Sequence, residues 1–139
     1  MPHVIVHTLA HARAALAACA ETGLPTTLSS PPDAARSLGV GYCLSLAEMA
    51  GAADFVVDCG DAPGLALAAL RGGARRVRVV AAPAVMVKLA DIADQLGARI
   101  ETQPPADILD LAAAYDPLTA TCEFLRQCSK KMFKFSHNT

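Results

Sequence analysis

The sequence predicts one α/β domain with three layers, in which helices cover both faces of a mainly parallel, five-stranded sheet. Short β-branched runs alternate with Ala/Leu-rich runs five times along the chain, and this alternation is typical of parallel βα units. The run from Val4 to Val6 and the run from Phe55 to Val57 are continuously apolar, as expected for strands buried on both faces. Of the 139 residues, 53% are hydrophobic and 18% charged, which excludes a disordered chain.

Helix and strand boundaries follow from capping and breaking residues. Thr8 is a suitable N-cap and Gly23 a suitable stop for the first helix, while Pro63 and Pro83 open two later helices. The predicted strands are residues 3–8, 25–30, 54–58, 75–81 and 98–102, and the predicted helices are residues 9–21, 42–50, 63–71, 83–96 and 106–115.

The order of the strands is predicted from the rule that parallel crossovers are right-handed. Five βα units fit the flavodoxin-like, receiver-like order 2-1-3-4-5. The alternative is an open half-barrel of βα units, which would be stable only when paired with a second copy. The helices are rich in alanine and bury little area per residue, so we expect the chain to self-associate into a homo-oligomer.

The C-terminal segment differs in composition from the rest. We assign residues 1–117 to the single α/β domain and residues 118–139 to a C-terminal helix or tail that is partly disordered. Three of the four phenylalanines and three of the four lysines, including Lys130, Lys131 and Lys134, lie in this segment. The segment is either a docking tail for an acidic partner or a frayed terminus.

Composition also limits the partners and the compartment. A formal net charge of −1 gives no basic footprint for nucleic acid, and no apolar run reaches the ~18–20 residues that span a bilayer. No secretory signal is visible at the N-terminus. Five cysteines without a C-x-x-C pair indicate thiols packed as small apolar residues in a reduced, cytoplasmic protein.

A ligand site is predicted at the carboxyl ends of the first and third strands, because open α/β sheets bind ligands where the strand order reverses. His7 and Thr8 follow the first strand, and Asp58 ends the third. We take Asp58, Asp61 and His7 as catalytic candidates. The ligand-binding candidates are Thr8, Ser29, Ser30, Cys59, Gly60 and Gly64.

These residue types suit two kinds of chemistry. Asp58 and Asp61 with His7 could hold Mg²⁺ or form an acid–base set, and the helix start near Gly64 could take a phosphate. The structural alternatives are an N-cap for Asp61, a turn for Gly60 and core packing for Cys59. No metal spacing is present, since the His7 and His11 pair spans a strand-to-helix turn. We therefore expect no resident cofactor, Mg²⁺ being the one candidate.

Residues 54–111 resemble a response-regulator receiver domain, in the run from Phe55 to Asp58 and the later Pro63-Gly64. The resemblance implies that Asp58 is the phosphoacceptor. His7 and Thr8 stand where that family has its acidic pair, and Gln103 stands where it has lysine. Residues 53–57 and 72–77 also look like the βα units of small aldolase barrels, without the strand-end lysine of those enzymes.

Two functional hypotheses follow. The first is a soluble, non-catalytic module that binds a small anionic ligand or a protein partner at the carboxyl edge of its sheet. The second is a small metabolic enzyme, a lyase, an isomerase or a phosphoryl-related enzyme, that uses Asp58 with His7 and Asp61.

Overall fold

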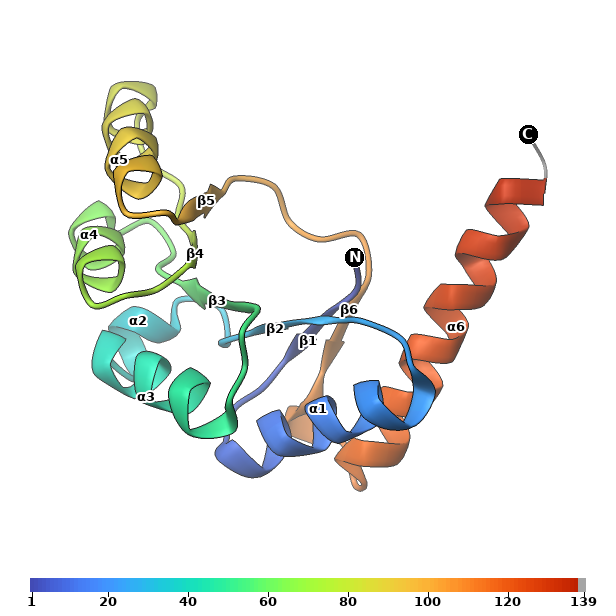
Figure 1. The fold of residues 1–139 in the computed structure, drawn as a ribbon. Coiled ribbons are helices and arrows are strands. Elements are labelled where there is room, and N and C mark those ends of the chain that lie inside the picture. Colours follow the sequence, from blue (N-terminus) through green and yellow to red (C-terminus); the bar gives the residue numbers. More distant parts are fainter. Residues whose placement is uncertain (138–139) are drawn as a thin grey trace. The chain divides into compact units, whose positions relative to one another are not determined.

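The computed structural model describes residues 1–137 and is an α/β fold with a parallel sheet of six strands and six α-helices in that range (Figure 1). The layered α/β class predicted from the sequence is confirmed. Within the described part, no helix is both long and apolar enough to cross a membrane. The chain forms two compact units, one of residues Met1–Leu28 with Pro105–Thr139 and one of residues Ser29–Pro104.

The number and order of the strands differ from the prediction. The strands are β1 (His3–Ile5), β2 (Thr27–Ser29), β3 (Phe55–Asp58), β4 (Arg76–Arg78), β5 (Arg99–Glu101) and β6 (Ile108–Asp110). Their hydrogen-bonded order is β5-β4-β3-β2-β1-β6, not 2-1-3-4-5. From β1 to β5 neighbours in the sheet are neighbours in sequence, which is the order expected of the alternative, a series of βα units as in an open half-barrel. The alternation of strands and helices in the sequence is the same for both orders, so periodicity alone does not distinguish them.

In the first unit, strand β1 (His3–Ile5) pairs in parallel with β6 (Ile108–Asp110), and Ile5 stands opposite Asp110. Strand β6 is followed by the short 3₁₀ helix η1 (Leu111–Ala113). The predicted helix at residues 106–115 is therefore wrong. The spacing of its leucines and alanines resembles that of an amphipathic helix. In the structure, the backbone of β6 pairs with β1, and this pairing takes the place of the hydrogen bonds within a helix.

Helix α1 (Leu9–Thr22) begins and ends where the sequence predicts. Thr8 is its N-cap and accepts a hydrogen bond from the His11 amide, and Gly23 closes it in the left-handed region at φ 70°. Strand β2 (Thr27–Ser29) follows at the boundary between the units. Capping chemistry is local, which explains why the sequence alone locates this helix.

Helix α6 (Pro117–His137) packs along α1 (Figure 1). Ala18 of α1 forms a buried cluster with Cys122 and Leu125 of α6. The predicted C-terminal helix is present, and it contributes to the core of the first unit. The end of the predicted tail, Asn138 and Thr139, lies outside the described residues.

The second unit contains three successive βα steps. Strands β3 (Phe55–Asp58), β4 (Arg76–Arg78) and β5 (Arg99–Glu101) pair in parallel in that order. Both crossovers run in the same direction, so right-handed connections place α4 and α5 on the same face of these strands, and the two helices are in contact. The helices of this unit are α2 (Ala34–Ser37), α3 (Val40–Ala50), α4 (Pro63–Arg71) and α5 (Pro83–Gln95).

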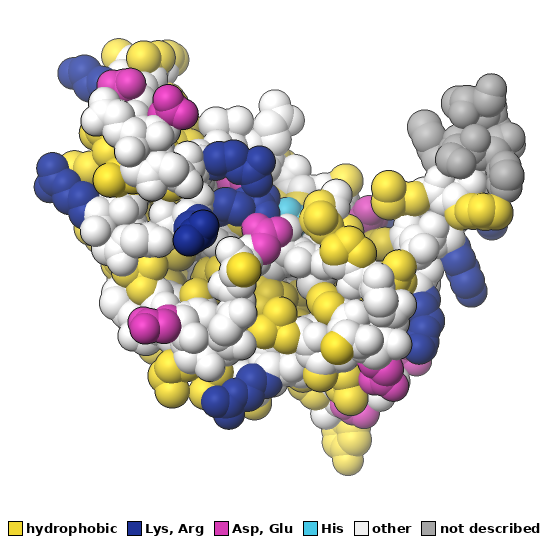
Figure 2. Space-filling view, in the orientation of Figure 1, with side chains coloured by type: hydrophobic (Ala, Val, Ile, Leu, Met, Phe, Trp, Pro, Cys, Tyr) yellow, Lys and Arg dark blue, Asp and Glu magenta, His cyan; other side chains and the backbone are white. Residues whose placement is uncertain are grey.

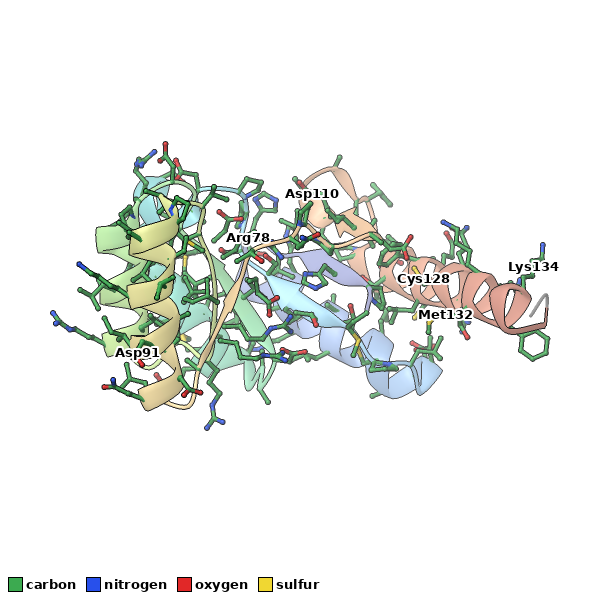
Figure 3. The ribbon with its side chains drawn as sticks, turned by 90° about the horizontal axis from the view of Figure 1, so that it is seen from above. Arg78, Asp91, Asp110, Cys128, Met132 and Lys134 are labelled. Carbon is green, nitrogen blue, oxygen red and sulfur yellow. The ribbon has the colours of Figure 1, made fainter. Side chains whose placement is uncertain are left out.

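The packing of α6 on α1 gives the first prediction. Leu125 is 1% exposed, so replacing Leu125 by Ala should lower the free energy of unfolding by about 2–5 kcal/mol, because a cavity replaces the lost side chain. Met132→Ala is the matched control, since Met132 on the same helix is exposed (Figure 3). Urea unfolding measures both. Equal, small effects would mean that α6 is not part of the folded core.

Candidate functional site

A histidine–aspartate pair stands at the carboxyl ends of β1 and β6. His7 follows β1, Asp110 ends β6, and the two strands are parallel neighbours. His7 Nε2 lies 2.7 Å from Asp110 Oδ1, which is the distance of a strong, charge-assisted hydrogen bond. The pair therefore lies at the sheet edge where ligands bind in open α/β folds.

Asp110 has a second hydrogen-bond partner besides His7. Its Oδ1 also accepts a hydrogen bond of 2.9 Å from the Ala112 amide at the start of η1. Burial would raise the pKa of Asp110, but the hydrogen bonds from Ala112 and His7 outweigh it and hold the pKa below its usual value. Asp110 is thus ionised at neutral pH and acts as the acceptor for the His7 imidazole.

His11 adjoins this pair from the first turn of α1. The His7 backbone N–H donates to His11 Nδ1 at 3.1 Å, and the two rings meet edge to face with centroids 5.8 Å apart. Burial, followed by the neighbouring His7, lowers the pKa of His11, with Asp110 opposing. His11 is therefore neutral near pH 7, and because its Nδ1 is an acceptor, the ring proton is on Nε2.

Sequence reasoning found His7 and missed Asp110. The sequence predicts a helix over residues 106–115, which includes Asp110, although two prolines lie shortly before Ile108 and a carboxylate ends the apolar pair Ile108-Leu109. Asp58 is placed in the same way after Phe55 and two valines. That similarity is the signal that could have identified a strand end.

In the second unit the side chain of Asp58 joins two loops by hydrogen bonds. Its Oδ1 accepts hydrogen bonds of 2.9 Å from the amides of both Asp33 and Gly60. Its own amide donates to the buried Ser30 hydroxyl at 2.8 Å, and Arg78 Nη1 lies 3.8 Å from its Oδ2. These contacts offset the free-energy cost of burying a carboxylate at a strand end. Asp58 therefore has a structural role.

Arg78 lies at the carboxyl end of the fourth strand. The predicted strand, residues 75–81, has Arg78 in its middle. The observed β4 is shorter, so Arg78 is its last residue and stands opposite Asp58.

The loop after β3 requires glycine at position 60. Gly60 has φ 55°, and a Cβ there would lie 2.4 Å from Asp33 Oδ1. Asp33 itself has φ 58°, the one positive φ of a non-glycine residue in the described chain. Among residues 1–137, Asp33 Oδ1 and Arg78 Nε are buried without a hydrogen-bond partner. The two loops are thus closely apposed and locally strained.

Asp61 does not cap α4. The N-cap is Ala62, without a side-chain hydrogen bond, and Asp61 Oδ1 accepts from Arg36 Nη2 at 2.7 Å. The hydrogen bond from Arg36 lowers the pKa of Asp61. Asp61 is 80% exposed, so the pair adds little stability. Gly64 stands in the first turn of α4, with open space where a Cβ would lie.

The remaining predicted ligand-binding residues are mostly occupied by the fold. Thr8 caps α1, and Ser29 Oγ donates to the Ser30 carbonyl at 3.0 Å. Cys59 is fully buried, and burial, followed by Asp58, raises the pKa of its thiol to about 12. Such a thiol is not a nucleophile at neutral pH, which favours core packing for Cys59.

The single site predicted from the sequence thus consists of two groups, each described within its own unit. His7 and Thr8 belong to the first unit, whereas Asp58 and Asp61 belong to the second. Joint action of His7 with Asp58 and Asp61 stays a prediction. Within residues 1–137, no three His, Cys, Asp or Glu side chains are arranged to hold a metal ion.

A cavity in the second unit lies away from the predicted edge. It has a volume of about 310 Å³ and is lined by the start of β3, including Phe55, and by the loop that ends at Arg75. These residues stand at the amino ends of β3 and β4. The predicted ligand-binding residues do not line it.

Comparison with known proteins finds no protein-family model that matches the chain and no curated protein with a matching sequence.

The hydrogen bonds accepted by Asp58 give the second prediction. Asp58→Ala leaves two loop amides without their acceptor, and each unsatisfied buried group costs about 1–3 kcal/mol. We expect the free energy of unfolding to fall by at least about 2 kcal/mol. Asp61→Ala, the matched control at an exposed carboxylate, should leave it nearly unchanged. Urea unfolding without ligand measures both. An Asp58→Ala variant as stable as the wild type would show that Asp58 is retained for function.

The lowered pKa of His11 gives the third prediction. Because the unfolded chain takes up this proton more readily than the folded one, the free energy of unfolding should decrease as the pH falls through about 6.5. His11→Asn keeps an acceptor near the position of Nδ1 and cannot titrate, so its decrease between neutral and mildly acidic pH should be smaller. Asp110 does not contribute there, since its lowered pKa places its loss of stabilisation below about pH 4.

Urea unfolding at several pH values compares the wild type with His11→Asn. Parallel curves for the two proteins would contradict a lowered pKa at His11.

Proposed function

We propose that the protein is a small enzyme that moves a proton on a carbonyl-containing small molecule, with His7 and Asp110 as its acid–base pair. The observation that carries the proposal is the 2.7 Å contact between His7 Nε2 and Asp110 Oδ1 at the carboxyl ends of adjacent parallel strands. An imidazole oriented by a carboxylate is the common arrangement for general acid–base catalysis.

The proposed transfer has two steps. Because the ionised Asp110 can only accept, Nε2 of His7 carries the proton of their hydrogen bond, and the His7 imidazole takes up the substrate proton. The ionised Asp110 stabilises the imidazolium that forms. It also holds the tautomer and the ring orientation. The same imidazolium returns the proton in the second half of the reaction.

His11 adds a hydrogen-bond donor beside the pair. Its Nδ1 is engaged by the His7 amide, which leaves Nε2–H as the donor of a neutral imidazole. A neutral imidazole polarises a carbonyl and hydrogen-bonds the developing enolate oxygen without giving up its own proton. A base next to such a donor suits proton removal from carbon adjacent to a carbonyl, as in an isomerase or a lyase.

Anion binding at the loop after β3 is a weaker proposal. Asp33, Asp58 and Asp61 bring three carboxylates to this loop, against the two guanidinium groups of Arg36 and Arg78. The local balance of charge therefore opposes an anionic ligand. A non-catalytic module that binds a protein partner there stays a proposal.

The compartment is also a proposal. All five cysteines are free thiols, four of them buried. Free thiols in every position fit the reducing conditions of the cytoplasm.

The fourth prediction tests the acid–base function directly. A panel of small aldehydes, ketones and 2-oxo acids is incubated with the protein in D₂O, and the loss of the proton signal next to the carbonyl is followed by ¹H NMR. We expect His7→Gln to slow exchange of the accepted compound by roughly 10²–10⁴-fold, the usual contribution of a general base. Asp110→Asn should slow it as well, because the pair loses its ionised acceptor.

Asp61→Asn is the matched control for this experiment, since it removes an exposed carboxylate of the second unit. Its exchange rate should equal that of the wild type. Exchange that survives in His7→Gln, or no exchange of any compound in the panel, would refute the proposal. Loss of exchange in Asp61→Asn would instead favour the set of Asp58, Asp61 and His7.

A further inference from the structure

Helix α5 and strand β5 leave an apolar surface uncovered. Of the thirteen residues of α5, only Leu89 and Ala93 are buried. Val87 is 70% exposed, and Met86, Val87 and Ala90 of α5 line a groove of about 470 Å³ together with Ile100 of β5. Figure 2 shows hydrophobic and charged side chains side by side over α5, at the upper left. We call the groove and the free edge of β5 the α5–β5 face.

Strand β5 is at the end of the sheet and pairs only with β4 among the described residues. The Arg99 amide donates to the Arg75 carbonyl, on the side of β4. Successive residues of a strand direct their backbone groups to opposite sides. The N–H and C=O of Ile100 therefore point away from β4, toward the open edge.

The charges along the edge of β5 are complementary to those of β5 in a second, antiparallel copy. Arg99 and Glu101 flank Ile100 and carry opposite charges. If two copies of β5 pair antiparallel about a two-fold axis at Ile100, Arg99 of one copy stands directly opposite Glu101 of the other, and the reverse. The two Ile100 residues then exchange two backbone hydrogen bonds. A parallel pairing in the same register would instead oppose like charges.

We propose that the α5–β5 face binds a second copy of this chain through antiparallel pairing of β5 with β5 and packing of the two α5 helices over the groove. An antiparallel strand pair at the edge of a parallel sheet is a common arrangement. The exposed Val87 of each copy enters the groove of the other copy. The exposed charges of α5, such as Asp91 (Figure 3), form a polar rim around this contact. This proposal is independent of the acid–base function at His7 and Asp110.

The fifth prediction concerns the oligomeric state, measured by analytical ultracentrifugation of the full chain over a range of concentrations. The wild type should sediment as a dimer. Arg99→Glu places like charges opposite each other, and Val87→Asp places a charge in the groove. Each should weaken the dimer by at least about tenfold, the effect of about 1.4 kcal/mol.

Two matched controls lie outside the α5–β5 face. Arg13→Glu reverses an exposed charge on α1, and Met49→Asp adds a charge at an exposed apolar side chain of α3. Both should leave the dimer unchanged. Far-ultraviolet circular dichroism and urea unfolding of every variant distinguish loss of pairing from loss of folding.

Cross-linking tests the two-fold axis itself. In an antiparallel hydrogen-bonded pair the Cα atoms are ~5.5 Å apart, a separation that a disulfide spans. Oxidation with diamide should therefore convert Ile100→Cys to a covalent dimer, and neither Met49→Cys nor the wild type should form one. A wild type that is monomeric at every concentration would overturn the proposal. A dimer that neither Arg99→Glu nor Val87→Asp weakens would do the same.

Discussion

Pairing of β1 with β6 is the constraint on which the first unit depends. It joins residues far apart in the chain, since His7 and Asp110 are separated by 103 positions. Closing so long a loop is entropically unfavourable, and the burial of apolar surface between α1 and α6 offsets it. The same pairing brings Asp110 to His7. Stability and the candidate chemistry of this unit therefore depend on one contact between strands.

Two aspartates at the ends of parallel strands have different roles. Asp58 gives one carboxylate oxygen to two backbone amides and holds two loops together. Asp110 accepts one amide of η1 and keeps the imidazole of His7 in place. Asp58 is buried, which is costly for a carboxylate without such partners, whereas Asp110 is half exposed. Whether such an aspartate serves the scaffold or a reaction depends on which neighbour the fold brings to it.

Alanine-rich helices explain why apolar surface remains on the second unit. A small side chain lets α4 approach the strands closely, but buries little area. The last helix in the series, α5, has no further βα unit beyond it, so most of its side chains stay outside the core. Its strand, β5, is also the end of the sheet. The same series that folds the second unit leaves an α5–β5 face suited to a second copy.

The sequence by itself determined the features that depend on near neighbours in the chain. These are the α/β class, the limits of α1 with its cap at Thr8, the helix at Pro63 and the burial of Cys59. Only the tertiary structure decided which strands are neighbours, because alternation and capping are the same in either strand order. It turned a predicted helix into β6, brought Asp110 to His7 and moved Arg78 to Asp58. Those outcomes depend on long-range pairing, which no local pattern encodes.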